Sequence, residues 1–376
     1  MKKNVLFALI IIIIIGAIAY LSIYNKNKKE SLVFGSLLPL SGNVSAYGEM
    51  MQKGQLLALK EINKNNKDNV NISFLNTEHK KDVALTRLIE AKNNNINIFV
   101  ELFGSDQAEH CLDYIKQNNL FVMSGVDTKP DLVEKGNGNF IRIMPSDAEA
   151  TKEIFNWIEE KKLHNISIVY VNDDWGNGLL NSALYNLNKS NLKLVNKIDI
   201  NKNQPSFSST ILKLKESNPD AVCLFVYPDD GGRLIKEAFR NDFNPHFFAT
   251  ENFTGNDMIK TAKKAANSVK LIVPSTSEEN PIFKKMKEEY FKIYNEEPTI
   301  FAIKGYDAVL VMYDIIQKSD GKDLISIKKT IKNGYSFEGA SGKISFDEKG
   351  EFISSKYNRL EYKIVNDSIK LIQVEK

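Results

Sequence analysis

The sequence contains few of the residues from which metal centres and catalytic triads are built. Its two cysteines, Cys111 and Cys223, both lie in apolar segments, so we expect two buried free thiols rather than a disulfide. No strand-like segment is followed by GxGxxG, or by GxxxxGK and a hydroxyl residue. The scattered histidines lack the spacing of a Ser/His/Asp triad or a metal site, and they are His79, His110, His164 and His246. We therefore expect a protein that is not an enzyme and needs no metal or cofactor.

The chain also lacks net charge outside its N-terminus. The 50 Lys and Arg and 47 Asp and Glu include five lysines and one glutamate in residues 1–30, which leaves 45 basic against 46 acidic residues elsewhere. A nucleic-acid partner normally requires a basic face, so we expect none. The composition, 43% hydrophobic and 26% charged, is that of a globular protein.

The one long apolar run lies at the N-terminus. Two lysines precede an uncharged stretch of 20 residues, 5–24, which is followed by the polar spacer NKNKKE. About 20 apolar residues can span a bilayer as a helix, while Ala17-Ile18-Ala19 offers a small-x-small cleavage site. We expect residues 1–30 to direct export, either as a signal peptide or as an uncleaved membrane anchor. No cysteine lies near the run, which excludes a lipid-modified N-terminal cysteine.

Short apolar segments rich in Ile and Val alternate with helix-like segments along most of the chain. The strand-like segments are 32–38, 71–75, 96–103, 120–124, 166–171, 192–198 and 220–226. This alternation is typical of parallel sheets covered by helices on both faces. A chain of 376 residues is too long for one core, so the pattern predicts two α/β lobes. The last part, helical over 280–332 and then strand-like, has a different rhythm.

Polar and aromatic side chains follow the ends of the predicted strands. In open α/β sheets, ligands bind beyond the carboxyl ends of the strands. Hydroxyls and main-chain N–H groups at helix starts suit a carboxylate, and an acid such as Glu251 suits an ammonium. Together they predict an amino-acid site between two lobes. The residues concerned are Ser41, Tyr47, Gly104, Ser105, Asp106, Gly125, Val126, Asp127, Thr128, 172–176, Tyr227, Pro228, Asp229 and Glu251.

Each of these residues taken singly has a simpler structural explanation. Ser and Thr near strand ends are more often helix caps than ligand contacts. Glu251 at a strand end is more often solvated, and Tyr306 in FAIKGYDAVL is more often packed within a helix. The hypothesis of a ligand site therefore depends on the arrangement of these residues and not on any one of them.

Four segments resemble the periplasmic binding proteins of the Leu/Ile/Val type over residues 32–376. They are SLLPLSGNVSAYG with GQLLALKEIN, VYVNDDWGNGL, DAVCLFVYPDDGGRLIKEAF and FEGASGKISFDEKGE. The resemblance implies a type I, two-lobed Venus-flytrap fold with three hinge crossings, near 143–147, 273–276 and 338–346. Residues 31–144 and 275–338 would form lobe 1, and residues 145–274 and 339–376 would form lobe 2.

The resemblance also implies a role for eight residues. Ser105 and Thr128 would hold the carboxylate of the ligand, while the Val126 carbonyl and Glu251 would hold its ammonium, with Tyr227 beside Glu251. The aromatic positions around the ligand fall on Tyr47, Trp175 and Tyr306. The sequence departs from the family pattern at Glu101, where a glycine is usual, and at Asp106, where a small hydroxyl residue is common. Extra acid near the carboxylate of a ligand repels it unless the acidic side chains point away.

The function implied is capture of an amino acid or related small polar molecule in the interlobe cleft and delivery to an ABC transporter permease. The protein would be a monomer in the periplasm or on the outer face of the cytoplasmic membrane, held there if the N-terminal segment is retained. The alternative is a membrane-tethered sensing module of the same fold that acts on a receptor partner. No signalling domain follows the last strands, although a partner could supply one.

Overall fold

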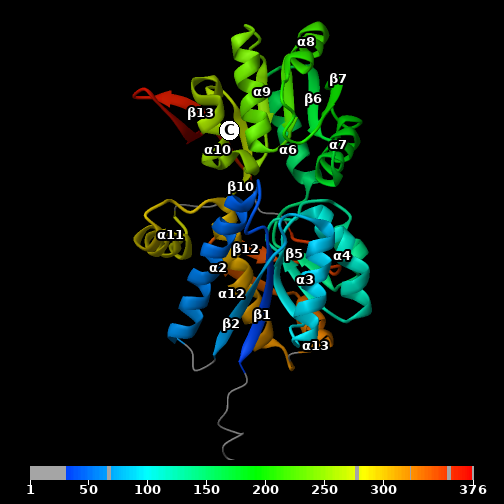
Figure 1. The fold of residues 1–376 in the computed structure, drawn as a ribbon, viewed down its shortest axis with the longest axis vertical. Coiled ribbons are helices and arrows are strands. Elements are labelled where there is room, and N and C mark those ends of the chain that lie inside the picture. Colours follow the sequence, from blue (N-terminus) through cyan, green and yellow to red (C-terminus); the bar gives the residue numbers. More distant parts are fainter. Residues whose placement is uncertain (1–30, 66–68, 276–278, 322, 354–356, 375–376) are drawn as a thin grey trace, which may run out of the picture.

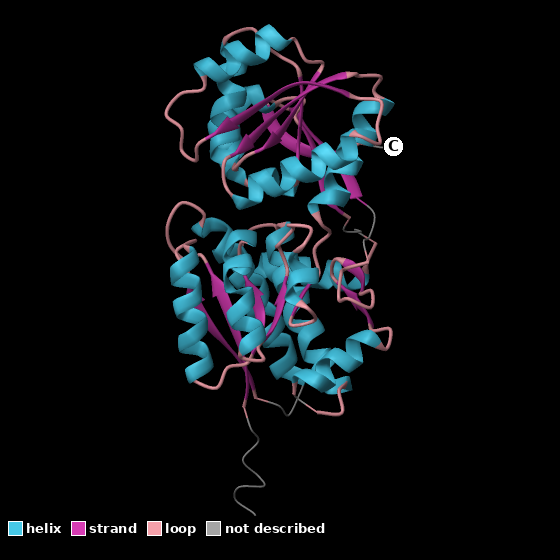
Figure 2. Ribbon diagram, turned by 90° about the vertical axis from the view of Figure 1, so that its right-hand side faces the viewer, coloured by secondary structure: helices cyan, strands magenta, loops and turns pink. Residues whose placement is uncertain are grey.

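The computed structural model describes residues 31–374 apart from 66–68, 276–278 and 322, and 354–356. The expected signal peptide or anchor, residues 1–30, lies outside the described residues. The described chain forms two α/β lobes, one above the other in Figure 1 and seen from the side in Figure 2, as the sequence predicts. No helix among the described residues is both long enough and apolar enough to cross a membrane.

Lobe 1 is built on a five-stranded parallel sheet in the order β2-β1-β3-β4-β5. Its strands are β1 (Leu32–Leu38), β2 (Val70–Asn76), β3 (Ile98–Leu102), β4 (Phe121–Ser124) and β5 (Phe140–Arg142). One face is covered by α2 (Ser45–Asn65), α11 (Pro281–Tyr294), α12 (Ile300–Lys318) and α13 (Leu324–Lys332). The other face is covered by α3 (Lys81–Asn93), α4 (Ser105–Gln117) and α5 (Leu132–Gly136). The sheet is therefore buried on both sides, which explains its apolar strands.

Lobe 2 contains a seven-stranded sheet in the order β14-β13-β10-β9-β8-β6-β7. The parallel strands are β6 (Asn165–Val171), β7 (Lys193–Ile200), β8 (Ala221–Phe225), β9 (His246–Ala249) and β10 (Lys270–Pro274). The antiparallel strands β13 (Tyr357–Val365) and β14 (Ser368–Gln373) complete one edge. One face carries α6 (Asp147–Glu160) and α7 (Asp174–Leu187). The other carries α8 (Ser208–Ser217), α9 (Pro228–Arg240) and α10 (Asn256–Ala262), with the short helices η1 (Glu251–Thr254) and η2 (Lys263–Ala266) nearby.

The boundary expected at residue 339 is wrong, because the hairpin β11 (Ser336–Gly339) and β12 (Gly342–Ser345) belongs to lobe 1. Ile344, Phe346 and Phe352 are buried in the same apolar cluster as the lobe 1 sheet. Figure 1 accordingly shows β12 in the lower lobe and β13 in the upper one. The third crossing therefore lies between Phe352 and β13, later than the expected 338–346. The first crossing lies between β5 and α6, and the second lies between β10 and α11.

Two buried charges on α12 hold the chain near the crossings. The Asp307 carboxylate accepts from the backbone N–H groups of Ala340 and Ser341, at 2.7 and 2.8 Å. The Lys304 ammonium donates to the Ile143 carbonyl at 2.7 Å and to the Ser341 hydroxyl at 3.0 Å. One lobe 1 helix therefore contacts both the first crossing and the hairpin that precedes the third.

Helices α2 and α12 approach each other closely in lobe 1. A Cβ at Gly54 of α2 would lie 1.9 Å from the Ala302 carbonyl oxygen of α12, so a side chain would force the helices apart.

Elsewhere in the two lobes, Cys111 and Cys223 are buried and free, which confirms the expectation of two unpaired thiols.

Candidate functional site

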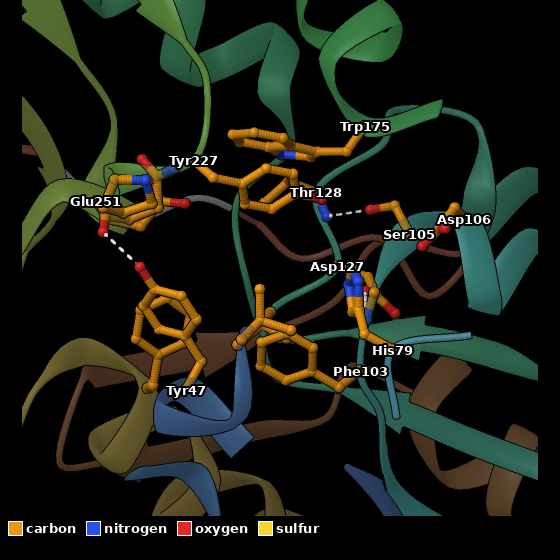
Figure 3. A pocket seen from close by; sticks show the side chains of 16 residues that line it. Tyr47, His79, Phe103, Ser105, Asp106, Asp127, Thr128, Trp175, Tyr227 and Glu251 are labelled. Atoms are coloured by element: carbon orange, nitrogen blue, oxygen red, sulfur yellow. Dashed lines mark hydrogen bonds between the residues drawn. The ribbon is translucent and has the colours of Figure 1, made fainter. Parts of the chain in front are cut away.

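A pocket lies between the two lobes, where strand ends from both sheets face each other (Figure 3). Its volume is about 610 Å³, counting space open to solvent. Seven of the eight residues predicted from the sequence line it, namely Tyr47, Ser105, Val126, Thr128, Trp175, Tyr227 and Glu251. The first four belong to lobe 1 and the last three to lobe 2. That these residues bind a ligand stays a prediction.

Tyr306 does not line this pocket, so its expected place beside the ligand is corrected. It lies on α12 and faces α2, where its hydroxyl donates to Glu61 at 2.5 Å. Phe301, in the first turn of the same helix, lines the pocket instead. Its ring centroid lies 4.7 Å from that of Tyr47 and 6.2 Å from that of Phe103. The first turn of α12 reaches the cleft, whereas Tyr306 lies more than one turn deeper in the lobe.

Ser105 begins α4, directly after β3, and its hydroxyl oxygen is already an acceptor. It accepts from the backbone N–H groups of Thr128 and Lys129, at 3.2 and 3.3 Å, and Figure 3 draws the first of these bonds. The hydroxyl proton is left to donate to a ligand. The adjoining N-terminus of α4 favours a negative group, as expected for a carboxylate subsite.

Glu101 is directed under the pocket loop and is absent from the pocket lining. Its carboxylate accepts from the Ser124 hydroxyl and the Gly125 N–H, both at 2.8 Å, and from the Leu102 N–H at 3.1 Å. Burial raises the pKa of Glu101 to about 8, although these hydrogen bonds oppose the shift. This departure from the family pattern therefore supports the loop that carries Val126 and does not face a ligand.

Asp106, the second departure, does line the pocket. Burial raises the pKa of its carboxyl group, opposed by the N–H of Gln107 and by the charge of Lys81. The backbone just before it is unusual, because Gly104 has φ +111° and donates its N–H to Asp127 Oδ1 at 2.8 Å. A side chain at Gly104 would meet the Gln107 side chain at 2.6 Å as well as being strained by this φ.

Glu251 and Asn252 supply the lobe 2 wall opposite Tyr47. Glu251 starts the short helix η1 after β9 and is 9% exposed. Burial raises the pKa of Glu251 to about 7, its own backbone N–H opposes the shift, and the charge of Asp147 adds to it. The Tyr47 hydroxyl donates to the Asn252 carbonyl at 3.5 Å, the second dashed line in Figure 3, and so joins the two lobes.

Trp175 and Tyr227 form an aromatic wall on lobe 2. Their ring centroids are 5.2 Å apart, and the Tyr227 hydroxyl donates to Asp173 Oδ2 at 3.0 Å. The Lys202 ammonium lies 4.3 Å from the centroid of the Tyr227 ring. The same Asp173 caps α7 by accepting from the Gly176 N–H at 2.8 Å, so the strand end and the helix start fix this wall together.

The sequence reasoning did not assign a site role to His79. This residue follows β2 in a loop, has φ +54°, and lines the pocket. Its ring lies 6.4 Å from that of Phe103 and 6.3 Å from that of Tyr227. Burial lowers the pKa of His79 to about 4, and the charge of Lys202 acts in the same direction, so the imidazole is neutral at pH 7. Its place at a strand end in lobe 1 was the one signal that could have identified it.

The site can hold a small molecule that has both polar and apolar parts. Hydroxyls, carboxyl groups and backbone N–H groups lie among large aromatic surfaces, which is the usual make-up of a small-molecule pocket. No three His, Cys, Asp or Glu residues within the described ranges are grouped so that they could hold a metal ion.

The chain matches a family model described as periplasmic binding protein over residues 31–363. The leucine-, isoleucine-, valine-, threonine- and alanine-binding protein of Pseudomonas aeruginosa is 23% identical over 322 residues, 83% of this chain and 85% of the relative. The leucine binding protein LivK of Thermotoga maritima is 20% identical, with TM-score 0.83 over 91% of this chain and 97% of its own. LivJ of Streptococcus pneumoniae, in complex with isoleucine, is 20% identical, with TM-score 0.81 over 92% and 100%.

The family match covers most of the chain, and the two structures share its fold. Members of this family are exported solute-binding proteins that work with ABC transporters. The chain therefore belongs to the periplasmic binding protein family, in which its relatives are of the branched-chain amino-acid type.

Proposed function

We propose that this chain captures an amino acid, or a related small polar molecule with an amino group, between its lobes and delivers it to an ABC transporter permease. The observation that carries the proposal is the arrangement of Ser105 and Thr128 on lobe 1 opposite Glu251 on lobe 2. The hydroxyl and helix N-terminus suit a carboxylate, and the acid suits an ammonium. The relatives are named as proteins that bind leucine or leucine, isoleucine, valine and other amino acids, which supports the same ligand class.

In this proposal the ligand joins the two lobes in the closed state. The lobes already touch at the cleft through the Lys81–Asp174 ion pair, the Tyr47–Asn252 hydrogen bond and the packing of Tyr227 against an apolar cluster of lobe 1. A ligand that contacts both lobes stabilises the closed form in proportion to its differential affinity for that form. At 100 times its dissociation constant it would stabilise the folded protein by about 2.7 kcal/mol.

The remaining expectations belong to the same proposal. The protein acts as a monomer without catalysis, and the apolar segment 5–24 directs export and either is removed or stays as an anchor. Mass spectrometry of the protein from its native membrane fraction distinguishes removal from retention, and gel filtration with light scattering tests the monomer. A mature chain that begins near residue 20 would show removal, an intact N-terminus would show retention as an anchor, and a dimer would contradict the expected monomer.

The first experiment is a thermal-shift screen of the purified protein against the L-amino acids, their amides and small carboxylic acids. We expect a rise in melting temperature with one chemical group of amino-group ligands. Calorimetry with the best ligand then compares Glu251→Ala with Glu216→Ala, an exposed glutamate in the same lobe. Removing one partner of a buried charge pair costs about 3–5 kcal/mol, so Glu251→Ala should lose at least about 100-fold in affinity. Unchanged affinity would contradict the proposed site.

A further inference from the structure

The ionisable side chains that line the pocket are strongly unbalanced in kind, with acids and no bases other than His79. Asp106, Asp127 and Glu251 line it, whereas no lysine or arginine lies among its lining residues, all of which are described. The ammonium groups nearby are already engaged, because Lys81 pairs with Asp174 and Lys202 lies over the Tyr227 ring. Asp173, just beyond the lining, adds a further carboxyl group. An anionic ligand therefore has no free cation to meet among the residues that line this pocket.

Asp127 gives an independent indication of the kind of group that the ligand presents to this pocket. Its side chain is 1% exposed, and its Oδ1 accepts from the Gly104 N–H at 2.8 Å. Its Oδ2 is buried and has no hydrogen-bond partner in the described part of the chain. A buried carboxyl oxygen without a donor is costly, and a donor group on the ligand would satisfy it.

The neighbours of Asp127 form one compact subsite. A Cβ built on Gly104 would lie 3.2 Å from both Asp106 Oδ1 and His79 Nε2, so these two atoms lie on the same side of Gly104. Figure 3 shows Asp106, Asp127 and His79 at the end of the pocket that also holds Ser105, with Glu251 at the opposite end. The imidazole is neutral at pH 7, because burial lowers the pKa of His79 to about 4. Beside the Ser105 hydroxyl, this end thus offers two carboxyl groups and a neutral imidazole, and no charged cation among the lining residues.

The aromatic walls agree with a cationic ligand. Trp175, Tyr227, Tyr47, Phe103 and Phe301 all line the pocket. Aromatic faces attract ammonium groups within about 6 Å of the ring centroid, and Tyr227 already has Lys202 at 4.3 Å. Aromatic walls with carboxyl groups at both ends recognise a molecule that carries amino or amide N–H groups at both ends.

We propose that the ligand carries net positive charge and presents an N–H donor, an amide or an amine, to Asp106 and Asp127 in place of a free carboxylate. This inference rests on the proposed function for the site and names the ligand class more narrowly. It departs from the zwitterion that the resemblance implies. The Ser105 oxygen already accepts from two backbone N–H groups, so its hydroxyl proton is left to donate to the carbonyl oxygen of an amide.

The test uses sets of three ligands that share a side chain and differ in charge. For the side chains of alanine, leucine and phenylalanine, the amino-acid amide is a cation, the amino acid a zwitterion and the deaminated acid an anion. Calorimetry on the full-length protein at pH 7 measures each affinity. We expect the best amide to bind about tenfold more tightly than the matching amino acid, and the acids to show no binding.

Variants then assign the preference to the two aspartates. Asp106→Asn and Asp127→Asn should each bring the ratio of amide to amino-acid affinity close to one. Asp113→Asn, on the exposed face of the same helix α4, should leave the ratio unchanged. Thermal unfolding checks that each variant is folded, and the wild-type ratio decides the proposal if a variant is not.

The outcomes separate this inference from the proposed function. Amino acids that bind as tightly as their amides, or more tightly, would overturn the inference and leave the proposed function standing. A carboxylic acid that binds best would overturn the inference as well. No binding of any amino acid or amide would contradict both.

Discussion

Glu251 is the residue whose ionisation most directly affects ligand capture in our proposal. Burial raises the pKa of Glu251 to about 7, and only the ionised carboxylate attracts an ammonium. Affinity should therefore fall as pH decreases through 7, by about tenfold per unit once the carboxyl is protonated. Burial also raises the pKa of Asp106 and Asp127, so their protonation acts in the same direction.

Calorimetry from pH 5.5 to pH 8.5 with one ammonium ligand measures this dependence. Glu251→Gln is the matched control, because an amide cannot ionise; it should bind weakly, with a shallower pH dependence. An affinity that is constant over this range in the wild type would exclude ammonium recognition by Glu251.

Tyr306 provides a second prediction at the scale of single residues. Because its hydroxyl bonds Glu61 outside the pocket, Tyr306→Phe should leave ligand affinity within about twofold while lowering the unfolding free energy by about 1 kcal/mol. Phe301→Ala should instead weaken binding at least about tenfold, since that ring lines the pocket. Denaturant unfolding and calorimetry on both variants measure the two effects. A large loss of affinity in Tyr306→Phe would restore the original prediction.

Strand ends allowed most of the pocket lining to be predicted from the sequence. The first residues after β3, β4 and β9 include Ser105, Thr128 and Glu251, each within four positions of its strand end, and parallel strand ends meet at one edge. Phe301 and Tyr306 lie on one helix, and the family resemblance assigned Tyr306 to the site although its helical context favoured packing within the lobe. Contacts within the lobe settle this, because the Tyr306 side chain reaches α2.

At the scale of elements, α12 fixes the hairpin that precedes the third crossing. Asp307→Ala would leave the buried N–H groups of Ala340 and Ser341 without their acceptor. We expect the unfolding free energy to fall by about 3 kcal/mol, measured by urea denaturation. Asp320→Ala, an exposed acid just beyond the same helix, should change it by less than about 0.5 kcal/mol. Equal stability of the two variants would show that this carboxylate does not hold the hairpin.

The parallel strands were predictable because Ile- and Val-rich runs are typical of sheets buried on both faces. The place of the hairpin β11–β12 was not. Ile344 of β12 and Phe346 just after it suit either lobe by composition, and only packing against the lobe 1 core assigns them. Long-range packing, which local patterns do not encode, therefore displaced the third crossing from its predicted place.

At the scale of the whole molecule, the Lys81–Asp174 ion pair connects lobe 1 to lobe 2 beside the pocket. Both side chains are about two-fifths exposed, 44% and 43%, and exposed pairs contribute about 0–1 kcal/mol. Lys81→Ala should therefore weaken ligand affinity by no more than about fivefold at low salt, and by less at high salt.

Calorimetry at two salt concentrations measures this effect. Lys80→Ala is the control, because Lys80 pairs with Glu78 inside lobe 1. A loss of affinity well above fivefold, or one that persists at high salt, would indicate that Lys81 contacts the ligand itself.

Because the chain crosses between the lobes three times, each lobe is built from segments that are synthesised at different times. Lobe 1 begins with β1 but needs α12 and the segment up to Phe352 to fill its core. Lobe 2 lacks one edge of its sheet until β13 and β14 have been made, at the very end of the described chain. Every residue that lines the pocket is synthesised by residue 301, yet neither lobe is then complete. A ribosome-bound or C-terminally truncated chain would thus carry all the pocket residues without the scaffold that lets the lobes close on a ligand.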